Sequence, residues 1–198
     1  MKKLILILWA FIFFFQSHAQ VLRGTEAMLA VPGSETVRMD DHALTPLHVV
    51  YARNQQPSFT QPEKFLKEQF SLPSSFGLEI LSMEEDQMGM KHYRYRAISD
   101  GIPIIGSMYL FHTEIGKITS FNGFIPKYVP AVKPKPAIVR DQALNIALNH
   151  IGAATYKWQM PAEEAFLKAE QHNPNVTFYP EGRLVYAPKS IEGIETEF

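Results

Sequence analysis

The stretch from residue 91 to residue 126 constrains the fold of this chain most, because its turn signals are unambiguous. Asp100-Gly101 is a dipeptide that favours the positive φ angles of a two-residue hairpin turn, and β-prone residues flank it on both sides. Before this turn, polar and apolar side chains alternate, with His92, Arg94 and Arg96 on one face and Tyr93, Tyr95 and Ala97 on the other.

A long apolar run, residues 102–112, follows the turn, and its Pro103 and Gly106 indicate an edge or a β-bulge near the start. Residues 114–116 provide a second turn, and residues 117–124 a third strand. The stretch therefore predicts an antiparallel meander. It carries no chemistry by itself.

A helix and one more strand are predicted just upstream of this meander. Thr60 has the position of an N-cap, with Glu63 placed to bond back, and Leu72-Pro73 ends the helix. Phe65, Leu66 and Phe70 form its apolar stripe. Residues 78–83 read as the first strand, before an acidic turn at 84–87. One helix laid across about four antiparallel strands gives an α+β arrangement, which resembles a cystatin.

Three blocks in this region resemble the fungalysin/thermolysin propeptide domain. They read GMKHYRY at residues 89–95, GIPIIG at 101–106 and GKITSFNG at 116–123, in the order and at the spacing of that family. The family often has a second glycine or an acidic residue after the position of Gly106, where this chain has Ser107-Met108. The resemblance implies a pro-region of a secreted thermolysin-type zinc metalloprotease, and we assign it to residues 59–126.

The first 19 residues are predicted to be a secretory signal peptide. Lys2-Lys3 precedes an apolar core at residues 4–15, and a small-residue site predicts cleavage between Ala19 and Gln20. A membrane anchor is the alternative, but this core is short against the roughly 20 residues of a membrane span. We expect a secreted or periplasmic protein that has no membrane association after cleavage.

The remaining regions are predicted as follows. Residues 20–58 form a partly irregular N-terminal segment with a turn at 32–34 and a short strand within 44–51. Residues 127–137, rich in proline and lysine, form a stiff linker. Beyond it, residues 140–151 predict the clearest helix, with a stripe of Ala143, Leu144, Ala147, Leu148 and Ile151 and a stop at Gly152. A second helix at 161–169 and a strand at 184–187 follow.

Residues 141–158 together with residues 184–188 resemble the opening of a PepSY domain, which follows the propeptide domain in thermolysin-type precursors. A single strand with a short partner cannot bury a helix face, so the module at 138–198 looks truncated. We therefore expect the chain to be a fragment whose next strand begins near Glu197.

Composition excludes several classes of function. The formal net charge is −1, and removal of the leader with its two lysines leaves 17 basic against 20 acidic residues, or −3, which argues against nucleic acid as a partner. The absence of cysteine excludes disulfides, thiolate nucleophiles and Cys-based metal sites. We identify no catalytic, cofactor-binding or metal-binding residue, because no His-Glu-x-x-His, G-x-S-x-G or phosphate-binding glycine motif is present.

Several weaker signals are compared with a purely structural interpretation. His112-Thr113-Glu114 fits part of a zinc deaminase motif but lacks its cysteines, so a strand end is favoured, and His92 reads as an exposed polar residue. The acidic run 84–86 could bind calcium or form a solvated turn. Asn175 fits a glycosylation sequon or a loop asparagine. Tyr93, Tyr95 and Phe111 could form a partner surface, although packing beneath the helix is favoured.

The resemblance implies that the chain assists folding of a catalytic domain and inhibits it, so the domain of its own precursor is the expected partner. Zinc and calcium are expected for that catalytic domain, and no cofactor is expected in this chain. Phe124, Ile125 and Pro126, with the edge of the second meander strand, are the predicted contact surface. The alternative is a stand-alone exported protease inhibitor or binding module.

Overall fold

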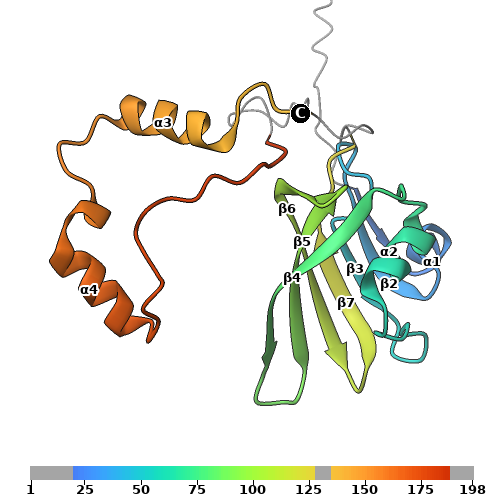
Figure 1. Cartoon of the computed structure of the whole chain (residues 1–198). Helices are drawn as coiled ribbons and strands as arrows, with labels where there is room; N and C mark the ends of the chain where they lie inside the picture. The colour runs from blue at the N-terminus through green and yellow to red at the C-terminus, as the bar shows by residue number, and fades with distance from the viewer. Residues whose placement is uncertain (1–19, 128–134, 188–198) are drawn as a thin grey trace, which may run out of the picture.

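A computed structural model describes residues 20–127 and 135–187. Its centre is a seven-stranded antiparallel sheet in the order β1-β2-β3-β7-β6-β5-β4 (Figure 1). The strands are β1 Gln20–Arg23, β2 Ser34–Met39, β3 His48–Tyr51, β4 Phe76–Glu85, β5 Lys91–Ser99, β6 Ile102–Glu114 and β7 Lys117–Gly123. The helices are α1 Thr25–Ala30, α2 Pro62–Phe70, α3 Arg140–Ile151, the short 3-10 helix η1 Lys157–Gln159 and α4 Pro161–Glu170.

Part of the predicted organisation lies outside the described residues. This applies to the signal peptide, to residues 128–134 of the linker and to residues 188–198. Of the predicted cleavage pair, Ala19 lies outside and Gln20 is the first residue of β1.

The predicted meander is confirmed in strands β4 to β7. Asp100 and Gly101 have φ angles of 48° and 77°, so both residues of this turn have the positive φ that the dipeptide favours. Ile115 and Gly116, with φ of 49° and 71°, make the second hairpin turn. The predicted irregularity near the start of β6 is also present, because the β5–β6 register shifts between Arg96 and Ile98 and Gly106 has φ of 81°.

The sheet has seven strands where the sequence predicts about four, because the N-terminal segment contributes three. β3 lies within the predicted stretch 44–51, while β1 and β2 were not predicted. β3 pairs with β7 through Val49 and Phe121, so the sheet continues across the boundary expected at residue 59.

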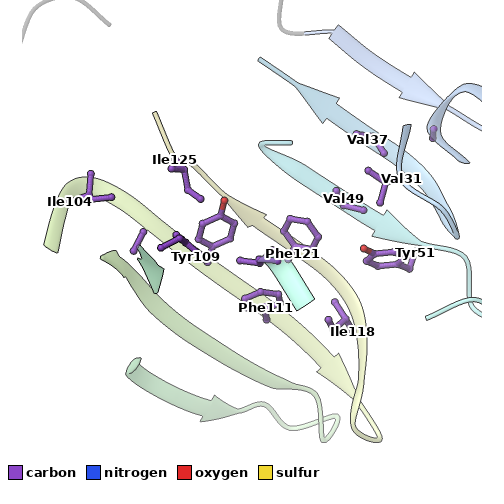
Figure 2. Close-up of a cluster of buried hydrophobic side chains, with 14 of the residues drawn as sticks. Val31, Val37, Val49, Tyr51, Ile104, Tyr109, Phe111, Ile118, Phe121 and Ile125 are labelled. Atoms are coloured by element: carbon purple, nitrogen blue, oxygen red, sulfur yellow. The ribbon is translucent and has the colours of Figure 1, made fainter. Parts of the chain in front are cut away.

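The hydrophobic core lies on one face of this sheet, and α1 and α2 contribute Ala27 and Leu66 to it. Figure 2 shows its largest side chains projecting from β6, β7 and β3, with Tyr109, Phe111 and Phe121 at the centre. From α2, Leu66 is fully buried, and Phe65 and Phe70 pack edge-on against Phe121 with ring centroids 6.2 and 5.9 Å away. The predicted apolar stripe of this helix therefore faces the core, as expected.

The start of α2 differs from the prediction. The helix begins at Pro62, so Gln61 and not Thr60 is the N-cap, and no side chain caps it. Glu63 instead accepts hydrogen bonds from the Leu78 N–H at 3.2 Å and from Lys67 Nζ at 2.9 Å. The carboxylate thus joins the helix to β4, and the N1 preference of Pro62 sets the helix start.

The C-terminal region contains the two predicted helices. α3 has the predicted bounds, and Gly152 ends it in the left-handed conformation with φ of 59°. Among the described residues, no side chain of α3 or α4 is buried, so the predicted stripe of α3 is without a covering surface. The strand predicted at 184–187 does not start a second sheet: Tyr186 forms a parallel bridge to Ile104 of β6.

Candidate docking surface

β4 forms one edge of the sheet, and its outer side pairs with no strand among the described residues. Edge strands in soluble proteins are commonly short or protected by charge, proline or a bulge, because a bare edge can pair with another chain. This strand has 10 residues, and its middle exposes three large apolar side chains, Ile80, Leu81 and Met83. We define these three as the β4 patch.

The β4 patch is exposed because α2 covers the first half of β4 and not the second. Phe76 is buried and Leu78 packs against the core, whereas Ile80 and Met83 are 57% and 51% exposed. Ile80 and Met83 pair with Tyr95 and Tyr93 of β5, so they lie on the same face as the core. Leu81 lies at the register shift between Ile80 and Ser82.

Acidic groups border the β4 patch at both ends. Glu79 contacts Arg96 Nη1 at 3.5 Å, and Glu85 contacts Lys91 Nζ at 3.7 Å. Asp86, in the next turn, accepts hydrogen bonds from the N–H groups of Met88 and Met90 at 2.8 and 3.0 Å. The Met90 and Met88 N–H groups hold the pKa of Asp86 below its usual value. The patch is therefore an apolar centre with charged margins, in which Glu79 and Glu85 are paired with basic side chains.

The acidic run 84–86 is thus a strand end followed by a hydrogen-bonded turn. Glu84 and Glu85 are the last residues of β4, and Asp86 forms the turn. Within residues 20–127 and 135–187, no group of three or more His, Asp or Glu side chains is placed to hold a metal ion.

A hollow of about 490 Å³ lies at the opposite end of β4 from the acidic turn. Its walls come from the loop after α2, the β5–β6 turn and the chain after β7, and include Leu72, Phe76, Ile98, Ile104, Ile125 and Lys127. Its lining is mainly apolar, with Asp100 and Lys127 as its charged members. Hollows of this size with a mainly apolar lining are typical of sites that bind apolar groups.

The three predicted contact residues occupy different environments. Ile125 and Pro126 are buried, and Ile125 forms part of the wall of the hollow. Phe124 is half-buried, and its N–H donates to the Met108 carbonyl at 3.2 Å. Strand β6, whose edge was also predicted as contact surface, lies between β5 and β7 for most of its length.

A histidine pair on the outer face of the sheet was missed by sequence reasoning. His92 of β5 lies opposite His112 of β6, with their Nδ1 atoms 2.7 Å apart. His92 Nε2 lies 3.3 Å from Asp86 Oδ2. Burial lowers the pKa of His112, and the neighbouring His92 and His48 lower it further, although Asn122 opposes them. A cross-strand pair depends on register, which the separation of 20 residues does not reveal.

The tyrosines of β5 take the predicted packed position. Tyr93 and Tyr95 contact the core cluster, and Phe111 is fully buried. Tyr93 lies against Phe59 with a ring-centroid distance of 4.4 Å. The β4 patch, by contrast, was not predicted as a surface. Its signal in the sequence is Ile80-Leu81, because adjacent strand residues face opposite sides and both cannot be buried by one layer of helices.

Comparison with known families supplies the decisive observation. Residues 76–124 match the family model described as Fungalysin/Thermolysin Propeptide Motif. The chain contains a fungalysin/thermolysin propeptide motif. No curated protein and no solved structure matches the chain.

The propeptide motif coincides with a structural unit. It begins at the first residue of β4 and ends one residue after β7, so it comprises the whole meander and includes the β4 patch. Such a motif belongs to the pro-region of a protease and not to its catalytic domain. The PepSY resemblance of residues 138–198 lies outside the match and stays a prediction. Within the described part of the chain, no helix is long and apolar enough to cross a membrane.

Proposed function

We propose that this chain is the pro-region of a secreted thermolysin-type zinc metalloprotease precursor, in which it acts as intramolecular chaperone and inhibitor. The observation that carries the proposal is the match of the complete β4–β7 meander to the propeptide motif. The catalytic domain would carry the zinc and calcium. The predicted signal peptide supports export, and the PepSY-like helices would form part of the same pro-region.

The chaperone role rests on a physical argument about rates. A catalytic domain with a high folding barrier is trapped kinetically, and a partner that binds the transition state for folding lowers the barrier without altering the final stability. A preformed sheet suits this role because it offers a rigid edge and an apolar surface. The β4 patch is the surface that we assign to this contact, because its three exposed apolar side chains lie on a strand edge that pairs with no strand among the described residues.

The predicted contact residues contribute through the hollow in this proposal. Ile125 lines the hollow, into which one apolar side chain of the catalytic domain would insert, and the half-buried Phe124 precedes it in the chain. Pro126 is buried and holds the local backbone through its bridge to Ala43. We expect the inhibitory segment further along the precursor, closer to the catalytic domain than the residues described above. We therefore assign no residue of this chain to the active-site cleft.

The coding sequence downstream of Phe198 tests the precursor reading. An in-frame extension with a His-Glu-x-x-His motif is the expected result. A stop codon directly after Phe198 in an intact gene would contradict it and favour a stand-alone exported inhibitor.

Inhibition by the purified chain, residues 20–198, tests the function itself. The chain should inhibit a thermolysin-type protease at a stoichiometry of one to one, and zinc-independent serine proteases provide the control. Two results together would refute both the pro-region hypothesis and the stand-alone inhibitor hypothesis. They are a chain that neither inhibits nor binds the protease, and a downstream sequence that lacks a catalytic domain.

A further inference from the structure

The start of β6 has a free side that β7 does not fill. The pairing of β6 with β7 begins at Tyr109 and Gly123, so residues 103–105 of β6 extend beyond it. The chain after β7 turns instead toward residues 42–44: the Leu44 N–H donates to the Ile125 carbonyl at 2.8 Å, and the Lys127 N–H to the His42 carbonyl at 3.0 Å. β5 occupies the other side of β6 through Ile98 and Pro103. Residues 103–105 of β6 therefore pair with β5 on one side, and β7 does not pair with them on the other.

Tyr186 fills this edge in a parallel orientation. Its carbonyl accepts a hydrogen bond from the Ile105 N–H at 2.8 Å, and its own N–H donates to the Pro103 carbonyl at 2.8 Å. Its side chain is 5% exposed and belongs to the same core cluster as Ile104. Figure 1 shows the chain after α4 returning to the sheet near β6. Tyr186 thus adds backbone pairing to β6 and an aromatic side chain to the core of the sheet.

Arg183 makes a second contact with the sheet. Its Nη2 lies 3.1 Å from each carboxylate oxygen of Glu79 on β4, which also contacts Arg96. These groups are partly exposed, so the ion pair contributes less to stability than to the position of the segment. Arg183 and Tyr186 together fix the direction of the chain between β4 and β6.

These contacts contrast with the rest of the C-terminal region. Among the described residues, α3 packs against no other helix or strand and α4 packs against η1 alone. The helices therefore have no apolar interface with the sheet that could hold them near it. Residues 183–186 provide the attachment.

We propose that residues 103–105 of β6 and Glu79 of β4 form a binding site for an extended peptide with an arginine and an aromatic residue, and that residues 183–186 occupy this site as a latch within the chain. The latch positions the region of α3 and α4 relative to the propeptide motif. The ligand chemistry is an arginine, two residues of any kind and an aromatic residue that inserts beside Ile104. This inference rests on contacts within the chain and does not depend on a protease partner.

The aromatic ring, and not the hydroxyl, carries the recognition. The Tyr186 Oη is buried and has no hydrogen-bond partner in the described residues. A phenylalanine would therefore retain the packing and remove an unpaired polar group. An alanine would lose the packing and leave a cavity. This difference provides matched variants for a test.

Hydrogen exchange of individual backbone amides in the full chain tests the latch. In the wild type, the Ile105 amide is expected to be protected by the Tyr186 carbonyl. Tyr186→Ala should accelerate its exchange at least tenfold, while Tyr186→Phe and the neighbouring exposed control Leu184→Ala should leave the exchange rate within twofold of wild type. The amides of Phe111 and Phe121 report whether the sheet stays folded.

The result that overturns the proposal is an Ile105 amide that exchanges equally fast in the wild type and in Tyr186→Ala. Arg183→Ala provides a second variant that leaves the core intact and should accelerate this exchange by a factor of two or more; no change would likewise count against the latch. Because the chain lacks cysteine, spin labels at Glu84→Cys and Asn149→Cys can report the distance between β4 and α3. This distance distribution should broaden in Tyr186→Ala, and an unaltered distribution would contradict the positioning role.

Discussion

His112 is half-buried on the outer face of β6, where histidine and acidic groups from three neighbouring segments surround it. His92 of β5 lies in hydrogen-bond contact, His48 of β3 and Asn122 of β7 lie nearby, and Asp86 contacts the far side of His92. The Nδ1–Nδ1 contact needs one donor and one acceptor, so it cannot persist when both rings carry two protons. The pair therefore makes the sheet sensitive to acid.

Acidification should destabilise the folded chain through His112. Burial, and after it the charges of His92 and His48, hold the pKa of His112 below its ordinary value of 6.5. The unfolded state then binds more protons, so the free energy of unfolding falls as the pH drops from about 6.5 through the lower folded-state pKa. Urea unfolding at pH 7.5 and at pH 5.5 should show this loss.

His112→Gln should reduce the difference between the free energies of unfolding at pH 7.5 and at pH 5.5. His42→Gln, in an exposed loop between β2 and β3, is the matched control and should retain the wild-type pH dependence. If the free energy of unfolding depends on pH equally in His112→Gln and in the wild type, other groups cause the acid sensitivity.

Gly123 permits the close approach of Tyr109 to the last residue of β7. A Cβ at this position would overlap the buried Tyr109 ring, which is held between Thr45 and the neighbouring aromatic side chains. Gly123→Ala should destabilise the chain by about 1–3 kcal/mol, because the ring has no free volume to move into. Thermal unfolding measures this, and Ser120→Ala on the outer face should change stability by less than about 0.5 kcal/mol. A neutral Gly123→Ala would mean that the ring can relax.

At the scale of elements, the carboxylate of Glu63 joins α2 to β4. Burial alone would raise its pKa, but hydrogen bonds from Lys67 and from the Leu78 N–H outweigh burial and lower the pKa. Glu63→Ala should cost about 1–2 kcal/mol, since it leaves the Leu78 N–H without its partner. Glu68→Ala, on the same helix and in an exposed pair with Lys64, should cost less than about 0.5 kcal/mol. Similar losses in chemical denaturation would refute the role of Glu63.

The β4 patch can be tested by placing a charge on it. Ile80→Lys should weaken binding to a thermolysin-type catalytic domain about tenfold or more, because a lysine at the centre of an apolar interface must lose its hydration. The control Ile115→Lys changes a residue that is 94% exposed at the tip of the β6–β7 hairpin, and should bind like the wild type. Isothermal titration calorimetry gives both affinities. Equal affinities of the two variants would show that the contact surface does not include the β4 patch.

The elements with strong local signals could be predicted from the sequence. Asp100-Gly101 set the first hairpin and Gly152 ended α3 at the predicted residue, since both positions require positive φ. The apolar stripe of Phe65, Leu66 and Phe70 correctly predicted which face of α2 packs against the core. These signals are local, so they do not depend on which strands pair.

The features that the sequence did not reveal depend on contacts between distant residues. β1 and β2 have short, largely polar sequences, and they are stabilised by pairing with β3, which in turn pairs with β7. Glu63 was predicted to cap its own helix because Leu78, its partner in the structure, lies 15 residues away. The pairing of Tyr186 with β6 and the contact of His92 with His112 depend in the same way on tertiary register.

At the scale of the whole molecule, the propeptide motif forms one side of a larger sheet, the four strands β7-β6-β5-β4. The N-terminal strands extend it on the β7 side, whereas the β4 side ends in an exposed apolar strand. One edge is thus formed by the short β1, and the other presents the β4 patch. This asymmetry supports the assignment of β4 to partner contact.

Refolding of a denatured thermolysin-type catalytic domain, with this chain added in trans, is the most direct test of the pro-region proposal. The account predicts that the yield of active protease, measured after the chain is removed by proteolysis, rises with added chain and levels off at one equivalent. Ile80→Lys should give a lower yield than Ile115→Lys. A yield that is the same with and without the chain, for a catalytic domain encoded in the same precursor, would contradict the account.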